Sequence, residues 1–290
     1  MDNANLGAVP SDGLSHVKGA TDGALSTRII SGLLADTAAR HGDREAVVFR
    51  EQGVRWSWRQ FAAEVDRLAA GLHALGLRRG DRIGIWSPNR VEWLVTQFAT
   101  ARIGLILVNI NPAYRLAELE YALRLSGRGA VIAAEGLRGA DYLAMLQAVA
   151  PKLPALDIVI RLGEGETPGM RRYADVLAPV GGVDAAALDA IEAPLGCFDP
   201  INIQFTSGTT GHPKGATLTH HNVVNNAIAV AAAMRFTAAD RLCIPVPLYH
   251  CFGMVLPRWR RCRRSAAPRC TGCRRCSSPG WTTRSSPAST

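Results

Sequence analysis

A short run rich in hydroxyl groups and glycine is the part of the sequence best suited to bind an anion. The run holds no large side chain and no carboxylate, and it comprises Thr206, Ser207, Gly208, Thr209, Thr210 and Gly211. Glycine permits unusual backbone dihedrals, so such a loop can turn its N–H groups inward around a phosphate. Lys214 adds a positive charge shortly afterwards. The composition therefore favours a phosphate-binding loop over the alternative, an ordinary solvated turn.

The elements on either side of this run follow from hydrophobic spacing. Residues 201–205 alternate Ile, Asn, Ile, Gln and Phe, which predicts a short strand. A helical pattern follows over 222–235, so the strand would lead through the loop towards a helix. The Walker A motif is excluded by spacing, because it needs Gly-Lys followed directly by Ser or Thr. Here Pro213 precedes Lys214 and Gly215 follows it, so the loop is a phosphate cradle of another type.

The ten residues 206–215 resemble the signature loop of the adenylate-forming enzymes. This superfamily contains the acyl-CoA synthetases, firefly luciferase and the adenylation domains of peptide synthetases. The flanking Thr219-His220-His221-Asn222 also resembles the family pattern. The resemblance implies that residues 206–211 and Lys214 hold the β- and γ-phosphates of ATP. Lys214 would position and stabilise charge rather than act as a base.

A second stretch, Pro247-Leu248-Tyr249-His250-Cys251-Phe252-Gly253, resembles the aromatic–histidine motif of the fatty-acyl-CoA synthetases. The resemblance places His250 near the substrate carboxylate and the acyl-adenylate, with Phe252 and Gly253 shaping the acyl pocket. A neutral imidazole can hydrogen-bond a carboxylate without bringing a full charge. The alternative for a lone histidine in an apolar run is a satisfied core histidine. Cys251 is not expected to act as a nucleophile, because no base is marked for it.

Before the loop, the apolar spacing alternates between helical and strand periods, which predicts a layered α/β fold with mostly parallel sheets and flanking helices. Helices are expected over 26–41, 57–75, 89–102, 116–125, 139–149 and 185–190. Strands are expected over 46–49, 54–56, 82–86, 105–110, 130–133 and 157–161, with another over 241–244. Two helix starts resemble capping boxes, Ser57 with Gln60 and Asn89 with Glu92. The family resemblance extends over 26–256 and implies an incomplete N-terminal domain of the adenylate-forming fold.

The net charge of +9 comes from the last part of the chain. Residues 257–290 hold nine Arg and no acidic residue, which leaves 24 basic and 24 acidic residues over 1–256. The same segment has no Leu, Ile, Val, Met or Phe, so it is expected to be a disordered basic tail. Its composition is what a GC-rich gene yields in a wrong reading frame. Residues 1–25 are expected to form a flexible lead-in.

Cysteine and hydropathy patterns predict a cytoplasmic protein without a transmembrane segment. The three cysteines before residue 257 are scattered and form no disulfide framework: Cys197, Cys243 and Cys251. The later cysteines lack the second half of a zinc site, and no metal-ligating residue is predicted. Neither a signal peptide nor a bilayer-length apolar run is visible. No pattern indicates a particular oligomeric state.

The resemblance implies an acyl-CoA synthetase that joins a carboxylate, expected to be a fatty acid, to ATP and then to coenzyme A. Mg²⁺ would offset phosphate charge, and no nucleic acid is expected as a partner. The sequence lacks the family's Tyr-Gly-x-Thr-Glu and Thr-Gly-Asp motifs and its lid lysine, so the chain is expected to be inactive or half-competent. Two alternatives stay open. One is a non-catalytic nucleotide-binding remnant or regulator that pairs with a full-length synthetase, and the other is a nucleic-acid binder acting through the basic tail.

Overall fold

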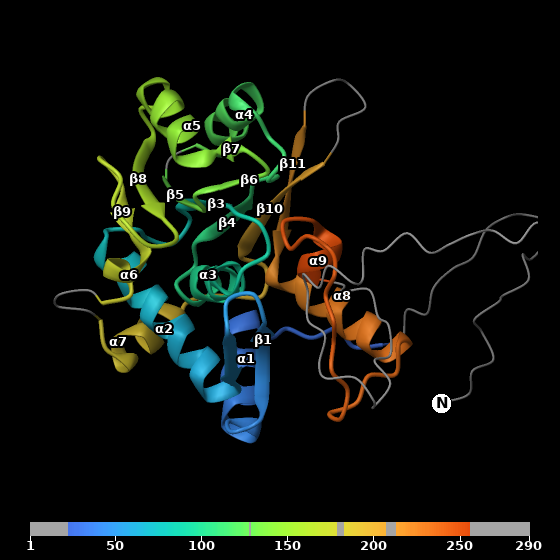
Figure 1. Ribbon diagram of the computed structural model, residues 1–290. Coiled ribbons are helices and arrows are strands. Elements are labelled where there is room, and N and C mark those ends of the chain that lie inside the picture. The colour runs from blue at the N-terminus through green and yellow to red at the C-terminus, as the bar shows by residue number, and fades with distance from the viewer. Residues whose placement is uncertain (1–22, 128, 179–182, 207–212, 256–290) are drawn as a thin grey trace, which may run out of the picture.

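The computed structural model describes residues 23–127, 129–178, 183–206 and 213–255. Within these ranges the chain builds a seven-stranded sheet with helices on both faces (Figure 1). In spatial order its strands are β11 (Lys214–Thr219), β10 (Pro200–Thr206), β4 (Ile106–Asn109), β3 (Arg82–Trp86), β5 (Gly129–Ala133), β8 (Leu156–Arg161) and β9 (Arg171–Arg172). Among the described strand pairs of this sheet, β10 and β11 are antiparallel and the others are parallel. The predicted mostly parallel α/β fold is confirmed.

Helices cover the two faces of this sheet unequally. One face carries α1 (Ile30–His41), α2 (Trp58–Ala74), α3 (Val91–Arg102) and α7 (Ala185–Glu192), and the other carries α4 (Leu116–Ser126) and α5 (Tyr142–Val149) (Figure 1). Short elements connect these layers: β1 (Glu45–Phe49), β2 (Val54–Ser57), β6 (Gly136–Leu137), β7 (Ala140–Asp141), the 3₁₀ turn Ala150–Lys152 and α6 (Tyr173–Val176). Two helices follow β11, namely α8 (His220–Ala233) and α9 (Cys251–Val255).

Helix α2 shows how the sequence determines the core. The Ser57 hydroxyl accepts a hydrogen bond from the Gln60 N–H, and the Gln60 side chain accepts one from the Ser57 N–H, which confirms the predicted capping box. Gly76 follows the helix with φ of +91°, a conformation that favours glycine. Four apolar side chains at helical spacing are buried, and each contributes about 1.5–3 kcal/mol: Phe61, Val65, Leu68 and Leu72.

A cluster of charges joins three of the helices. Arg102, at the end of α3, has a side chain that is 12 % exposed. Its guanidinium pairs with one carboxylate from α2 and two from α7, which are Asp66, Asp189 and Glu192. Burial disfavours the charged guanidinium, but these carboxylates outweigh it and raise the pKa of Arg102. The cluster therefore fixes α7 against the α2–α3 layer.

Two local predictions are wrong, and one strand was not predicted. Residues 241–244 form no strand, and they run as irregular backbone between α8 and α9. The helix expected after the signature loop is present as α8, but the strand β11 that precedes it was not predicted. The helix α3 begins without a capping bond from Asn89, since its N-cap residue is Arg90. The Val91 N–H is instead accepted by the Gln52 side chain at 2.7 Å. Gln52 lies in the β1–β2 turn, so a distant residue replaces the local cap.

Candidate functional site

The hairpin β10–β11 carries the two ends of the predicted phosphate loop. Thr206 is the last residue of β10 and pairs with Lys214, the first residue of β11. The Thr206 hydroxyl donates to the Lys214 carbonyl oxygen at 3.4 Å. The connecting residues 207–212 lie outside the described residues, so the roles of Ser207, Gly208, Thr209, Thr210 and Gly211 stay predictions. Lys214 is exposed, which leaves its side chain accessible to an anion.

Contacts from elsewhere in the fold fix the second half of this hairpin. The Tyr121 hydroxyl on α4 donates to the Pro213 carbonyl oxygen at 3.2 Å. A Cβ atom at Gly215 would lie 3.1 Å from Cγ2 of Ile203 on the facing strand, so a larger residue would require the Ile203 side chain to shift slightly. The backbone position of Lys214 is therefore restricted by contacts of both its neighbours, Pro213 and Gly215.

His220 links the signature segment to the start of the first helix. It opens α8 after a capping box in which the Thr219 hydroxyl accepts the Asn222 N–H at 3.2 Å. Its side chain is fully buried, and Nδ1 accepts the Ile30 N–H at 3.1 Å. Burial lowers the pKa of His220 to about 4, although the charge of Asp199 opposes the shift. His220 is therefore a neutral packing residue with its proton on Nε2.

The segment before His250 is held by Asn89. The Asn89 amide donates to the Val246 carbonyl oxygen at 2.9 Å and accepts the Leu248 N–H at 2.7 Å. Through these two bonds the Asn89 side chain pairs with the irregular backbone of residues 246–248, as the backbone of a neighbouring strand would. Asn89 follows β3 at its carboxyl end, the edge at which parallel sheets bind ligands. The sequence pattern assigned this residue to a helix cap, so its contact with the 246–248 backbone was missed.

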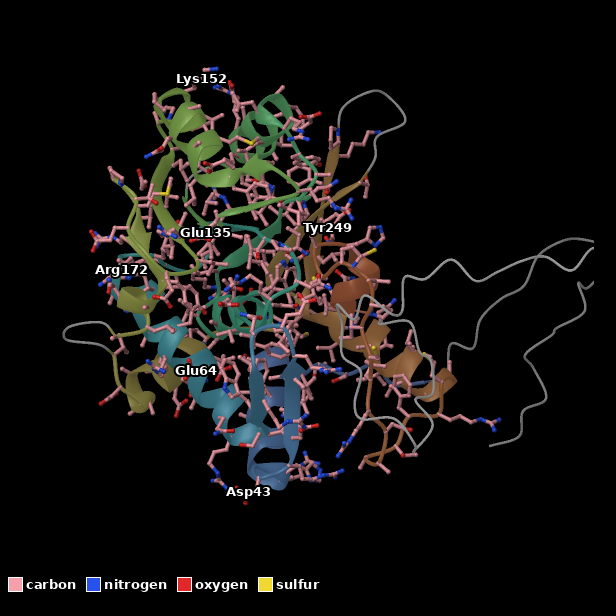
Figure 2. The ribbon with its side chains drawn as sticks, viewed as in Figure 1. Asp43, Glu64, Glu135, Lys152, Arg172 and Tyr249 are labelled. Atoms are coloured by element: carbon pink, nitrogen blue, oxygen red, sulfur yellow. The ribbon has the colours of Figure 1, made fainter. Side chains whose placement is uncertain are left out.

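A second clamp ties the same segment to the hairpin. Gln204, in β10, donates its Nε2 hydrogen to the Tyr249 carbonyl oxygen at 2.7 Å. Figure 2 shows Tyr249 close to the β10–β11 hairpin. The strand that enters the phosphate loop is therefore bonded directly to the residue before His250. The two predicted motifs, which are separate in the sequence, are brought together at one edge of the sheet.

His250 itself is exposed, so it is not a core histidine. Its ring Nδ1 lies 3.7 Å from the Cys251 sulfur, and its backbone N–H donates to the Pro247 carbonyl oxygen at 3.3 Å. Gly253 is buried under the same turn, and a Cβ atom there would lie 2.1 Å from the Pro247 carbonyl oxygen. Only glycine allows that approach. The predicted pocket residue Phe252 lies in α9, but its side chain is outside the described part of the structure.

Hollows among the described residues also form away from this edge of the sheet. A cavity of about 160 Å³ lies at the amino ends of β3, β5 and β8, and a groove of about 810 Å³ lies between α2 and residues 166–178. Neither is lined by Lys214 or His250. Ligands of parallel sheets bind at the carboxyl ends of the strands, which favours the hairpin edge as the site. Over the residues that the structure describes, no group of three or more His, Cys, Asp or Glu side chains could hold a metal ion.

The residue pattern and the fold identify the class of this protein. The chain belongs to the family of AMP-binding enzymes, which it matches over residues 34–259. It is 41 % identical over 266 residues to the medium-chain acyl-CoA ligase ACSF2, mitochondrial, of Danio rerio, a match that covers 87 % of this chain and 44 % of the relative. The corresponding protein of Mus musculus is 42 % identical over 266 residues, covering 85 % and 43 %.

A solved structure supports the same assignment. The ATP-bound MatB of Rhodopseudomonas palustris is 31 % identical and superposes with a TM-score of 0.63 over 78 % of this chain and 42 % of that chain. The expected relationship to the adenylate-forming acyl-CoA ligases is confirmed. The chain spans less than half the length of the two ligases it matches. None of the helices within the described ranges has the length and apolarity needed to cross a membrane.

Proposed function

We propose that this chain carries the phosphate-binding and carboxylate-facing part of an ATP-dependent acyl-CoA synthetase. In the full reaction a carboxylate oxygen attacks the α-phosphorus of ATP, which forms acyl-AMP and releases pyrophosphate. The thiol of coenzyme A then displaces AMP and forms the thioester. The observation that carries the proposal is the bond from Gln204 to the Tyr249 carbonyl oxygen, because it places the phosphate-loop strand beside His250.

The residues at the hairpin fit the phosphates of ATP. Thr206 and Lys214 face each other at the ends of the loop, and Lys214 is exposed. Hydroxyls, glycine N–H groups and an ammonium are donors that suit phosphate oxygens, and each such bond to a charged group contributes about 1.5–3 kcal/mol. Residues 206–211 and Lys214 would hold the β- and γ-phosphates as negative charge grows on the departing pyrophosphate. Mg²⁺, bound through these phosphates, would neutralise part of that charge.

A ring N–H of His250 would donate a hydrogen bond to the substrate carboxylate, since its imidazole is exposed at the same edge. Phe252 and Gly253 would shape the acyl pocket beside it. The two relatives from Danio rerio and Mus musculus are named medium-chain acyl-CoA ligases. Their names favour a fatty carboxylate as the substrate of this site. A cytoplasmic location stays a prediction, because the same names place those relatives in mitochondria.

Lysine labelling with an amine-reactive reagent gives a direct test of this proposal. The chain has only three lysines, Lys18, Lys152 and Lys214, so each can be followed separately by mass spectrometry. We expect Mg²⁺–ATP or pyrophosphate to slow the labelling of Lys214 several-fold. Lys152 serves as an internal control, because its ammonium pairs with Glu120 on α4 and lies far from the hairpin (Figure 2). Equal labelling of Lys214 with and without the anions would contradict the proposal.

Fatty-acid-dependent exchange between ATP and pyrophosphate tests the catalytic half of the proposal. If this chain supports exchange, Lys214→Ala is expected to reduce it by orders of magnitude, since it removes a charge that stabilises the departing pyrophosphate. Lys152→Ala is the matched control and should leave the rate unchanged. Exchange that persists in Lys214→Ala would refute the role given to the loop.

We also propose that residues 257–290 are translated out of frame. The support is the abrupt change of composition after residue 256 and the end of the family match at residue 259. Sequencing the gene across the codons for 250–260, and translating both other frames, tests this directly. A continuous family-like sequence in another frame supports the proposal, and its absence in both frames rejects it.

A further inference from the structure

Three buried amide side chains form a directed chain of hydrogen bonds under the candidate site. Asn202 and Gln204 come from β10 and Asn109 from β4, and they are 2 %, 6 % and 2 % exposed. The Asn202 amide donates to the Asn109 side-chain oxygen at 3.2 Å, and the Asn109 amide donates to the Gln204 side-chain oxygen at 3.1 Å. Gln204 then donates to the Tyr249 carbonyl oxygen at 2.7 Å. Each amide therefore orients the next.

Stability alone does not account for this arrangement. Apolar side chains of similar volume would fill the same space without the cost of burying amides. The Asn202 side-chain oxygen is buried and has no hydrogen-bond partner among the described residues, so the chain of amides is not fully satisfied. Buried polar networks are worth their cost where they specify one geometry. Here the network specifies the position of the backbone at Tyr249, whose carbonyl oxygen Gln204 contacts.

The amide chain holds the His250 segment on both sides of the histidine. Gln204 bonds to Tyr249 just before it, and the Asn109 amide lies 3.5 Å from the Met254 sulfur just after it. The Asn89 clamp acts earlier, on residues 246–248. The amides on β4 and β10 therefore contact the segment at residues on either side of His250.

We infer that Gln204, oriented by Asn109, is a positioning residue that fixes His250 relative to the strand entering the phosphate loop. A movement of β10 would be transmitted to the Tyr249 carbonyl through one short bond. A role of this coupling in catalysis rests on the proposed function, but the structural coupling of Gln204 to the His250 turn does not. The coupling and the proposed function can therefore be refuted separately.

Hydrogen exchange of the unliganded chain tests the coupling. The N–H groups of His250, Gly253 and Met254 donate within the turn to carbonyl oxygens of Pro247 and His250. Gln204→Met keeps the side-chain length and removes the amide, so we expect these three N–H groups to exchange about tenfold faster or more. Gln147→Met is the matched control, because the Gln147 amide donates to the Pro168 carbonyl on the exposed side of α5. It should leave the turn unchanged.

A spectroscopic readout separates positioning from general loss of stability. The imidazole ¹H–¹³C signal of His250, assigned with His250→Gln, should move in Gln204→Met while the signal of the buried His220 stays in place. Gln204→Asn, which keeps an amide but shortens it by one methylene, provides a second variant if Gln204→Met does not fold. Its expected effect has the same direction.

The possible outcomes distinguish the positioning role of Gln204 from the proposed function. Unchanged exchange and an unmoved His250 signal in a folded Gln204 variant would overturn the positioning role. If both change while Lys214 of the native chain gains no protection from ATP or pyrophosphate, the coupling stands and the proposed function fails. If Lys214 is protected and the turn ignores Gln204, the proposed function stands without this positioning residue.

Discussion

Acid should destabilise this protein through His220, and the size of the effect follows from its surroundings. The side chain is fully buried and its Nδ1 accepts the Ile30 N–H. Burial lowers its pKa to about 4, against about 6.5 in an unfolded chain. The unfolded state therefore takes up a proton at a higher pH than the folded state does. The stabilisation is complete above about pH 6.5 and is lost as the pH falls towards 4, by about 2 kcal/mol at pH 5 and about 3 kcal/mol at pH 4.

Urea unfolding followed by tryptophan fluorescence at pH 7.5 and pH 5 measures this loss. Other groups also titrate in this range, so the informative quantity is the difference between the native chain and His220→Asn. Asparagine can still accept the Ile30 N–H through its side-chain oxygen, but it cannot take up a proton. We expect the free energy of unfolding of the variant to fall by about 2 kcal/mol less than that of the native chain.

A neighbouring substitution controls for simple loss of packing. Val223 is buried on the same helix, and Val223→Ala should lower the stability equally at both pH values, because it removes no titrating group. If His220→Asn shows the same dependence on pH as the native chain, then His220 does not carry the effect and its pKa in the folded protein is close to the unfolded value.

Two further predictions concern the scaffold. Arg102→Met leaves three carboxylates without their shared cation and should lower the free energy of unfolding by about 2 kcal/mol, whereas Arg67→Met removes one exposed pair and should cost less than about 0.5 kcal/mol. Gly71→Ala would place a Cβ atom 1.8 Å from the Val176 carbonyl oxygen, so we expect a loss of at least about 2 kcal/mol. The same change at Gly32, where the nearest atom is 3.6 Å away, should instead raise the stability by up to about 1 kcal/mol. Urea unfolding measures all four, and equal effects within either pair would contradict the reasoning.

The parts of the fold that could be predicted from sequence are those where local signals agree with tertiary packing. Helix α2 has a capping box, a strict apolar stripe and a terminal glycine, and the structure contains all three features. The buried strand β4 lies within the strand expected over 105–110, where five of the six residues are apolar. In both cases the residues that determine the element lie within it, so a short window of sequence carries the whole signal.

The failures arise where a distant residue decides the local structure. Asn89 and Glu92 have the spacing of a capping box, but Gln52 from the β1–β2 turn accepts the Val91 N–H in place of Asn89. The Glu92 side chain does not complete a capping box either, because its carboxylate accepts hydrogen bonds from Arg90 and Gln52. Burial alone would raise its pKa, but hydrogen bonds from Arg90 and Gln52 outweigh that effect and hold the pKa low. Spacing within one segment does not reveal such competition, because the competing partner lies about forty residues earlier.

In strand β10, too, distant residues decide the role of the side chains, which the local sequence pattern does not reveal. The same side chains lie next to the candidate site. Alternating apolar and amide residues normally indicate a strand with one face in water. Here Asn202 and Gln204 are buried, and their amides face Asn109 and the Tyr249 carbonyl instead of solvent. A conflict between residue type and burial is expected where geometry matters more than stability. The polar side of β10 is therefore better understood as the support of the His250 turn than as a surface of the sheet.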